Sequence, residues 1–321
     1  MKKITTLALV TLLLSGCASE PEGPKDYAAL AVGLSAGCES YSTGAGADLV
    51  SSEGAIGEFP EVSFPYPISG EGVETKVLIA GDGGPILGTQ RVALHYAGYN
   101  AATGEMFQAS SFTGDDYVFQ DLLAGNTPDF CQALTGVNVG SRVAVLLDPA
   151  SAHQGAGIAS LGIGPDQGVL FVFDVVDAYL PRANGDAKSA EAGMPTVILA
   201  PQGQPGVQIP ATDAPTEFNR TVLIEGGGEE IAIGDSVVVH YTGWTWEGDQ
   251  FDSSWDRQAP SVFTVSSDSL IEGFVQALEG VTVGSQVIAV IPPDLGYGDR
   301  AQGSIPAGST LIFVVDVLGK D

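Results

Sequence analysis

The chain has 321 residues, 44 % of them hydrophobic, which is enough for two or three domains with cores of their own and excludes a disordered chain. Its 39 acidic and 12 basic residues give a net charge of −27, which argues against a nucleic-acid-binding surface and against electrostatic docking on anionic lipid. We therefore expect no nucleic acid among its partners, and a soluble, self-repelling surface.

Residues 1–16 have the pattern of a bacterial lipoprotein signal peptide. Lys2 and Lys3 precede an apolar run, Ile4–Leu14, that is too short to span a bilayer as a permanent helix. The run ends in Leu-Ser-Gly before Cys17, which resembles the lipobox, where the cysteine is diacylated and becomes the first residue of the mature chain. An ordinary signal peptide followed by a chance cysteine is the alternative. We expect an exported cell-envelope lipoprotein that contacts a bacterial membrane only through lipid on Cys17.

Residues 17–57 are rich in Ser, Gly, Ala, Glu and Pro and show little periodicity, which predicts a lipidated tether. Cys38 lies in this tether, and Cys131 lies in the first folded unit. Because export permits disulfides, the two cysteines could pair and fasten the tether to that unit. A buried free thiol at Cys131 explains the sequence nearly as well, so the sequence leaves both readings open.

An internal repeat organises the rest of the chain. Phe130–Gly140 and Phe274–Gly284 match almost letter for letter, and other matches along the chain keep an offset of 142 to 145 residues. A register this steady predicts two related domains, at residues 58–181 and 194–321, joined by a linker at residues 182–193.

Each copy has the pattern of an α+β unit. In the second copy, Ser236–Tyr241, Ser285–Ile291 and Thr310–Leu318 read as strands rich in Val and Ile. Apolar residues within Leu270–Leu278 fall at helical spacing, with a serine or aspartate at positions 267–269 available as the N-cap. One short helix against several antiparallel strands predicts an α+β domain with the helix on one face of the sheet.

A short polar and aromatic stretch follows the strand that ends at Tyr241. It reads Phe251-Asp252-Ser253-Ser254-Trp255-Asp256-Arg257, and Leu270-Ile271-Glu272-Gly273-Phe274, Leu295-Gly296-Tyr297-Gly298 and Ile305-Pro306 lie downstream. Over residues 234–320 these motifs closely resemble the FKBP family, the macrolide-binding peptidyl-prolyl cis-trans isomerases. The resemblance implies two tandem FKBP-like domains of the α+β class. Each would be a twisted antiparallel half-barrel sheet wrapped on one short helix.

The resemblance also implies a site in the second copy. It assigns catalytic contacts to Tyr241, Phe251, Asp252, Ile271 and Tyr297, and substrate-binding contacts to Arg257, Leu270, Phe274, Ile305 and Phe313. By the same resemblance, Arg257 would pair with Asp252, and the Ile271 N–H would hold the substrate carbonyl. Two features depart from the family pattern: Ser261 stands where an aromatic is common, and the loop at residues 298–305 is short. Taken singly, each aromatic residue fits core packing, and the acid–arginine pair fits a loop-ordering salt bridge; the joint pattern favours a pocket.

The expected chemistry is rotation about the bond before proline, which needs no nucleophile, metal or cofactor. The planar amide resists rotation by about 18–20 kcal/mol through resonance, and twisting the bond weakens the polarity of its carbonyl. A dry aromatic pocket therefore suits the twisted state better than the planar one. The expected partners are proline-containing unfolded or exported polypeptides and, by resemblance, macrolide ligands. The expected function is to assist the folding of exported proteins. The alternative is a non-catalytic protein that holds proline-containing segments or a partner.

The first copy keeps the scaffold matches but loses the pocket residues. Gln108 stands at the position of Asp252 with no arginine after it, and Asn-Thr-Pro at residues 126–128 replaces the apolar pair at the start of the helix. His153 replaces Tyr297. The pattern predicts a degenerate domain that folds but does not catalyse.

Overall fold

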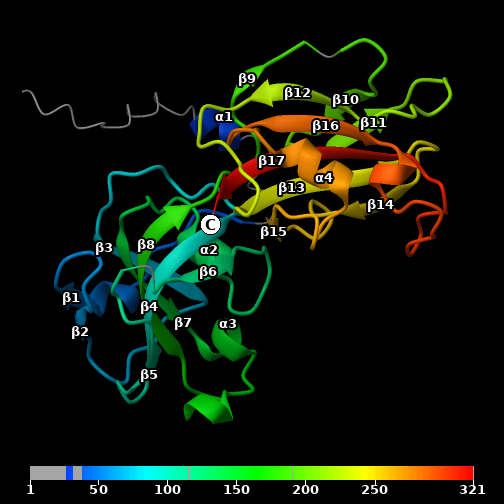
Figure 1. Ribbon diagram of the computed structural model, residues 1–321. Helices are drawn as coiled ribbons and strands as arrows, with labels where there is room; N and C mark the ends of the chain where they lie inside the picture. Colours follow the sequence, from blue (N-terminus) through cyan, green and yellow to red (C-terminus); the bar gives the residue numbers. More distant parts are fainter. Residues whose placement is uncertain (1–26, 32–37, 115, 190, 321) are drawn as a thin grey trace, which may run out of the picture.

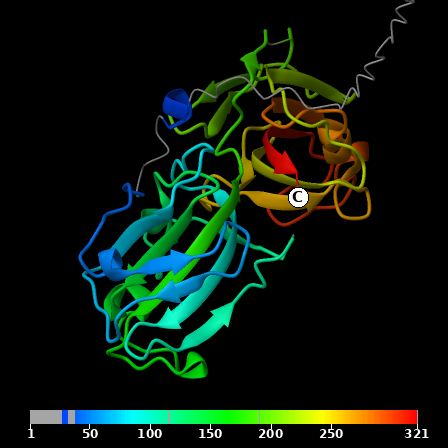
Figure 2. The ribbon, with the colours of Figure 1, turned by 90° about the vertical axis from the view of Figure 1, so that its left-hand side faces the viewer.

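The structure is a computed structural model, and it describes residues 27–31, 38–114, 116–189 and 191–320. The expected signal peptide and Cys17 lie outside these residues. Two antiparallel sheets with a few short helices form two domains, which lie side by side in Figure 1 and in the turned view of Figure 2. No helix in the described ranges is long and apolar enough to cross a membrane.

The two large sheets share the same order of six strands, and the second has one more strand at its edge. The first is ordered β3-β7-β8-β4-β5, with β6 also paired to β4, and the second β12-β16-β17-β13-β14, with β15 also paired to β13. The strands of the first are β3 (Val73–Ile79), β4 (Arg91–Asn100), β5 (Met106–Ala109), β6 (Val118–Asp121), β7 (Arg142–Leu147) and β8 (Val169–Ala178). Those of the second are β12 (Asn219–Glu225), β13 (Ser236–Thr245), β14 (Gln250–Ser253), β15 (Ser261–Thr264), β16 (Gln286–Ile291) and β17 (Leu311–Lys320).

The two sheets also agree in register. Gly243 lies opposite Asp252 on β13 and β14, and Gly98 lies opposite Gln108 on β4 and β5. The first-domain residue at the position of Asp252 is therefore Gln108, as the sequence predicts. This equivalence provides matched pairs of positions, one in each domain, for mutagenesis.

Both faces of the second sheet are covered, which explains its long apolar strands. Alternate residues such as Val239, Tyr241 and Val287 pack with helix α4 (Glu272–Leu278) on one face. Ile288 and Val314 face the other side, where they join the hairpin of β10 (Thr196–Leu199) and β11 (Pro205–Gln208). In the first domain α2 (Phe130–Leu134) is the equivalent helix, and β1 (Ser51–Glu53) with β2 (Glu61–Ser63) forms an additional pair.

The remaining helical segments are short. They are α1 (Tyr27–Ala31), α3 (Pro149–His153) and the 3-10 turns η1 (Ala47–Leu49), η2 (Ala159–Leu161) and η3 (Pro293–Leu295).

Residues 38–57, which the sequence predicts to be a tether, instead fold onto the first domain. Ala47 and Val50 are fully buried and pack with Tyr99 and Leu146. The sequence does not predict this packing, because linkers and tightly packed turns have the same Ser/Gly/Ala-rich composition. The described part of the first domain therefore begins at Cys38, not at residue 58.

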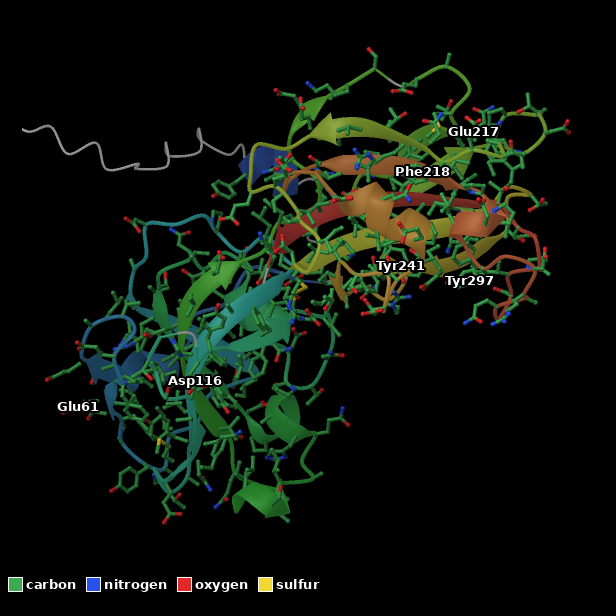
Figure 3. The ribbon with its side chains drawn as sticks, in the orientation of Figure 1. Glu61, Asp116, Glu217, Phe218, Tyr241 and Tyr297 are labelled. Atoms are coloured by element: carbon green, nitrogen blue, oxygen red, sulfur yellow. A yellow bond between two sulfur atoms is a disulfide. The ribbon has the colours of Figure 1, made fainter. Side chains whose placement is uncertain are left out.

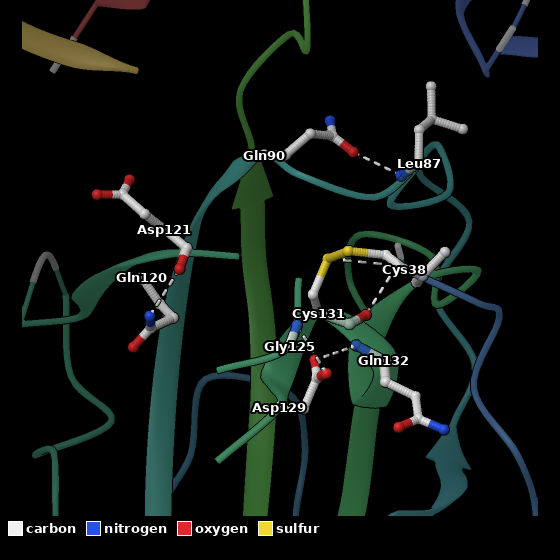
Figure 4. Close-up of a disulfide and its surroundings, with 10 residues drawn as sticks. Cys38, Leu87, Gln90, Gln120, Asp121, Gly125, Asp129, Cys131 and Gln132 are labelled. Atoms are coloured by element: carbon white, nitrogen blue, oxygen red, sulfur yellow. Dashed lines mark hydrogen bonds between the residues drawn. A yellow bond between two sulfur atoms is a disulfide. The ribbon is translucent and has the colours of Figure 1, made fainter. Parts of the chain in front are cut away.

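Of the two readings of the cysteines, the structure contains the disulfide. Cys38 and Cys131 are bonded with their Cα atoms 5.6 Å apart, across a sequence separation of 93 residues (Figure 4). Cys131 lies on α2, whose N-terminus is capped by Asp129 through a hydrogen bond from the Gln132 N–H (2.9 Å). The bond therefore holds the N-terminal segment against the helix of the first domain.

The expected linker at residues 182–193 is in part a piece of the second sheet. Strand β9 (Asp186–Ala187) pairs with β12 at the sheet edge, and the N–H groups of Asn184 and Gly185 donate to the Gly284 carbonyl. Just before it, the Leu180 N–H donates to the Leu318 carbonyl (3.1 Å). The two domains are thus joined by a segment that is hydrogen-bonded to the second domain.

A carboxylate lies buried at the same register position of each sheet. Asp174 pairs with Arg142, whereas Asp316 accepts hydrogen bonds from Gln286 Nε2 (2.7 Å) and the Ala183 N–H (2.9 Å). Burial raises the pKa of Asp316 to about 6, although these two hydrogen bonds and the charge of Arg182 lower it.

Replacing Asp316 by Asn should stabilise the protein at neutral pH. Because the folded-state pKa is above the unfolded value, the protonated form stabilises the fold at low pH, and this contribution is lost as pH rises from about 4 to 6. We expect Asp316→Asn to raise the free energy of unfolding by about 1–3 kcal/mol at pH 7 and by much less at pH 4. Urea unfolding at both pH values measures this. A variant less stable than wild type at pH 7 contradicts it.

Candidate functional site

A cleft of about 770 Å³ lies between α4 and the sheet of the second domain. It is lined by nine of the ten residues that the sequence assigns to the site, namely Tyr241, Phe251, Asp252, Leu270, Ile271, Phe274, Tyr297, Ile305 and Phe313. Tyr241 and Tyr297 are labelled in Figure 3, where both lie in the second domain. The tenth residue, Arg257, lies outside the lining.

Aromatic rings from different elements form the walls. Phe274 on α4 and Phe313 on β17 meet edge to face with ring centroids 5.0 Å apart, and Phe251 on β14 meets Phe313 at 5.5 Å. Tyr241 on β13 lies 6.1 Å from Phe274. Phe274 and Phe313 are each no more than 5 % exposed, so neighbouring side chains pack tightly around both rings, and the surface they form is apolar. Edge-to-face rings at such distances attract one another beyond simple burial.

The polar end of the cleft is a linked group of three side chains. The Tyr241 hydroxyl donates to Asp252 Oδ2, and Arg257 Nη1 donates to Asp252 Oδ1. Arg257 Nη2 lies 3.3 Å from the Tyr241 hydroxyl, and its guanidinium lies 5.7 Å from the centre of the Tyr241 ring. Arg257 also donates to Ser261 Oγ (3.3 Å), so the serine at this departure from the family pattern contacts the arginine. Arg257 thus does not line the cleft itself, but it holds two residues that do, Asp252 and Tyr241.

These contacts fix the protonation states. Burial raises the pKa of Asp252, but hydrogen bonds from Tyr241 and Arg257 outweigh burial and hold the pKa below its usual value. Burial, and next the hydrogen bond to Asp252, raises the pKa of the Tyr241 hydroxyl. At neutral pH the cleft therefore presents a carboxylate and a neutral phenol.

The histidine beside Tyr241 is structural. His240 stacks on Trp255 with ring centroids 4.2 Å apart, and its Nδ1 lies 2.9 Å from Ser254 Oγ. Burial, with the nearby charge of Arg257, lowers the pKa of His240 to about 3, so the ring is neutral at physiological pH. These contacts give His240 a structural role beside Tyr241.

The start of α4 differs from the sequence-based expectation. The expected cap at residues 267–269 is wrong, because the helix begins at Glu272, and Ile271 takes the N-cap position with extended backbone (φ −64°, ψ 145°). The serines before it form a separate turn, in which the Leu270 N–H donates to the Ser266 carbonyl (3.0 Å). Within the described part of the chain, the Ile271 N–H has no acceptor, so it is available to a ligand carbonyl.

Sequence reasoning missed several lining residues. Phe263 on β15 lies 5.7 Å from both Tyr241 and Phe274, ring centre to ring centre. A signal for it exists: alternation along β15 places Phe263 on the same strand face as Ser261 and opposite the exposed Val262. The other missed residues are rim positions with no local signature: Asp268, Ser269, Gln302, Gly303 and Ser304.

The equivalent region of the first domain has aromatic rings like those of the cleft, but it lacks the carboxylate and the arginine that Asp252 and Arg257 supply in the second domain. Phe107, Phe130 and Phe171 are half-buried and pack edge to face, with centroids 5.4–5.8 Å apart. Gln108 is exposed. His153, at the position of Tyr297, is held by its own loop: its Nε2 lies 2.8 Å from the Gln167 carbonyl, and its Nδ1 accepts from the Gly157 N–H.

Comparison with known proteins points to one family. Residues 227–318 match the model of the FKBP-type peptidyl-prolyl cis-trans isomerase family. The chain is 38 % identical to FK506-binding protein 1 of Aspergillus oryzae over 109 residues, 31 % of this chain and 94 % of that protein. It is 36 % identical to a probable FK506-binding protein of Corynebacterium glutamicum over 116 residues, 36 % of this chain and 97 % of that protein.

FK506-binding protein 2B of Rhizopus delemar is 49 % identical over 87 residues, which are 26 % of this chain and 42 % of that protein. Residues 227–318, which match the family model, contain the whole aromatic cleft and the Tyr241–Asp252–Arg257 group. The chain therefore belongs to the FKBP-type peptidyl-prolyl cis-trans isomerase family.

Proposed function

We propose that the second domain catalyses cis–trans isomerisation of X-Pro bonds in the cleft between α4 and the sheet. The observation that carries this proposal is the combination of aromatic walls with the linked polar group of Tyr241, Asp252 and Arg257 at one end of the cleft. The available Ile271 N–H completes the set, because it can bind the carbonyl that precedes or follows the proline.

Catalysis of this kind follows from differential binding. The planar amide is polar and well solvated, whereas the twisted amide has lost resonance and has a less polar carbonyl. Phe251, Phe274 and Phe313 hold the proline ring in an apolar space that gives the planar amide no compensation for lost water. Each 1.4 kcal/mol by which the cleft prefers the twisted state accelerates the reaction about tenfold.

The biological role that we propose is to assist the folding of exported proteins. X-Pro isomerisation takes tens to hundreds of seconds and can limit folding. The basic start, apolar run and Leu-Ser-Gly-Cys pattern of the N-terminus support export and lipid attachment at Cys17. The names of the relatives support macrolide binding in the same cleft.

We also propose that the first domain is a degenerate FKBP-like copy without isomerase activity. The support is its identical strand order together with the exposed Gln108 in place of Asp252.

A protease-coupled assay with a proline peptide tests the activity. We expect the full chain to accelerate isomerisation, and Tyr297→Ala to lower kcat/KM by about three- to tenfold, because an aromatic side chain that lines the cleft is removed. A full chain that leaves the uncatalysed rate unchanged, while still binding proline peptides, favours the non-catalytic binding protein.

A further inference from the structure

The β10–β11 hairpin touches the segment that carries Asp252 and Arg257. It lies outside residues 227–318, which match the family model, and its tip at residues 200–204 reaches the turn that follows β14. We propose that this tip is a positioning element that holds residues 251–257 in the arrangement the cleft requires. The proposal rests on the proposed isomerase function for its effect on rate, but not for its effect on the segment itself.

The first contact is a pair of hydrogen bonds on one carboxylate. Gln204 Nε2 donates to Asp256 Oδ1 (2.8 Å), and Gln250 Nε2 donates to Asp256 Oδ2 (2.8 Å). Gln250 is the first residue of β14, and Asp256 directly precedes Arg257. The Asp256 carboxylate therefore connects the start and the end of the segment to each other and to the hairpin. Hydrogen bonds to a charged acceptor are the stronger kind.

The second contact is close packing on Trp255. Gly203 is buried with φ +104°, and a Cβ added there would lie 3.0 Å from Trp255 Cη2 and 2.9 Å from Arg182 Cδ. Trp255 stacks on His240, and Ser254 Oγ, which contacts His240, accepts from the Tyr241 N–H (2.8 Å). Trp255 is therefore linked to Tyr241, in the wall of the cleft, through His240 and Ser254.

The hairpin tip is itself anchored at the domain junction. Arg182 Nη1 donates to the Pro201 carbonyl (2.8 Å), and the tip is closed by a hydrogen bond from the Ala200 N–H to the Gln204 carbonyl (2.9 Å). A tip fixed at one side can restrain the segment on the other side. This is the structural reason to treat the hairpin as support for the site and not only as a cover for the sheet.

Two pairs of variants of the full chain test the proposal. Gly203→Ala places a methyl group against Arg182 and Trp255 on a backbone with φ +104°, while Gly206→Ala in the same hairpin meets only the Ile198 carbonyl at 3.7 Å and is the control for a methyl group without these contacts. Gln204→Ala removes the bond to Asp256, and Gln204→Lys restores a donor. Gln208→Ala alters an exposed glutamine of β11 and is a further control.

We expect amide hydrogen exchange over residues 250–258 to accelerate about three- to tenfold in Gly203→Ala and Gln204→Ala. Exchange should be unchanged in Gly206→Ala and Gln208→Ala and restored to within twofold in Gln204→Lys. In the isomerase assay, kcat/KM should fall about two- to tenfold in the same two variants, and Gln204→Ala should have no further effect in an Asp256→Ala background.

Unchanged exchange in both Gly203→Ala and Gln204→Ala overturns the proposal, and so does an equal change in the controls. A wild-type protein without isomerase activity overturns the proposed isomerase function. The hydrogen-exchange result then still decides whether the hairpin holds residues 251–257.

Discussion

Replacing Arg142 by Ala should cost about 3–5 kcal/mol of unfolding free energy, the largest effect on stability that we expect from one substitution. Both Arg142 and Asp174 are 0 % exposed, and Nε and Nη2 of the arginine donate to the two carboxylate oxygens at 2.6 and 2.8 Å. The guanidinium also donates to the carbonyls of Gly54, Ala55 and Glu58. Its removal leaves a buried carboxylate without its cation and three backbone carbonyls without their donor.

The second domain suggests the control. There the equivalent pair is Gln286 with Asp316, so the double variant Arg142→Gln and Asp174→Asn replaces the ions by a neutral pair. We expect it to be more stable than Arg142→Ala, because no charge is left buried alone. Urea unfolding measures both variants. An Arg142→Ala protein within 1 kcal/mol of wild type contradicts the argument.

Replacing Asp252 by Ala should lower kcat/KM about 10- to 100-fold. Hydrogen bonds to charged groups contribute about 1.5–3 kcal/mol, and Asp252 accepts two of them, from Tyr241 and Arg257. Without the carboxylate the phenol and the guanidinium are no longer held, so the polar end of the cleft loses its order. On the acidic side, the activity of wild type should fall at a lower pH than the ordinary pKa of an aspartate would give, since hydrogen bonds from Tyr241 and Arg257 outweigh burial and lower the pKa of Asp252.

The matched control for this change is Gln108→Ala. Gln108 occupies the same register position in the first domain and is exposed, so its removal should leave the rate within twofold of wild type. Steady-state rates on one proline peptide compare the two variants. Equal losses in both, or no loss in Asp252→Ala, contradict the assignment of Asp252.

The sequence predicts the fold well where distant residues repeat. The matches across Phe130–Gly140 and Phe274–Gly284 identify two copies, and both have the same strand order in space. The sequence predicts the fold less well where short segments are held only by close packing. Ala47 and Val50 are buried, and β9 pairs with β12, through tertiary contacts. Small residues in a sequence give no signal that predicts such contacts.

The residues that the family resemblance assigns to the site lie together in one cleft, but the resemblance leaves out part of the rim of that cleft. Tyr241, Phe274 and Phe313 lie on β13, α4 and β17, where spacing fixes the direction of a side chain. Gln302 and Ser304 belong to a loop whose path depends on the turn it makes. Gln204 and Asp256, which form a hydrogen bond next to the site, are 52 residues apart in the chain. No local sequence pattern predicts a contact between residues at that separation.

The most direct test of the central claim, that one cleft per chain binds and catalyses, is a titration of the full chain with the macrolide FK506. Residual isomerase activity and heat of binding are followed together. We predict that one molecule binds per chain and that the rate falls to the uncatalysed value at saturation. Two equivalents bound, or activity that persists at saturation, would contradict the claim.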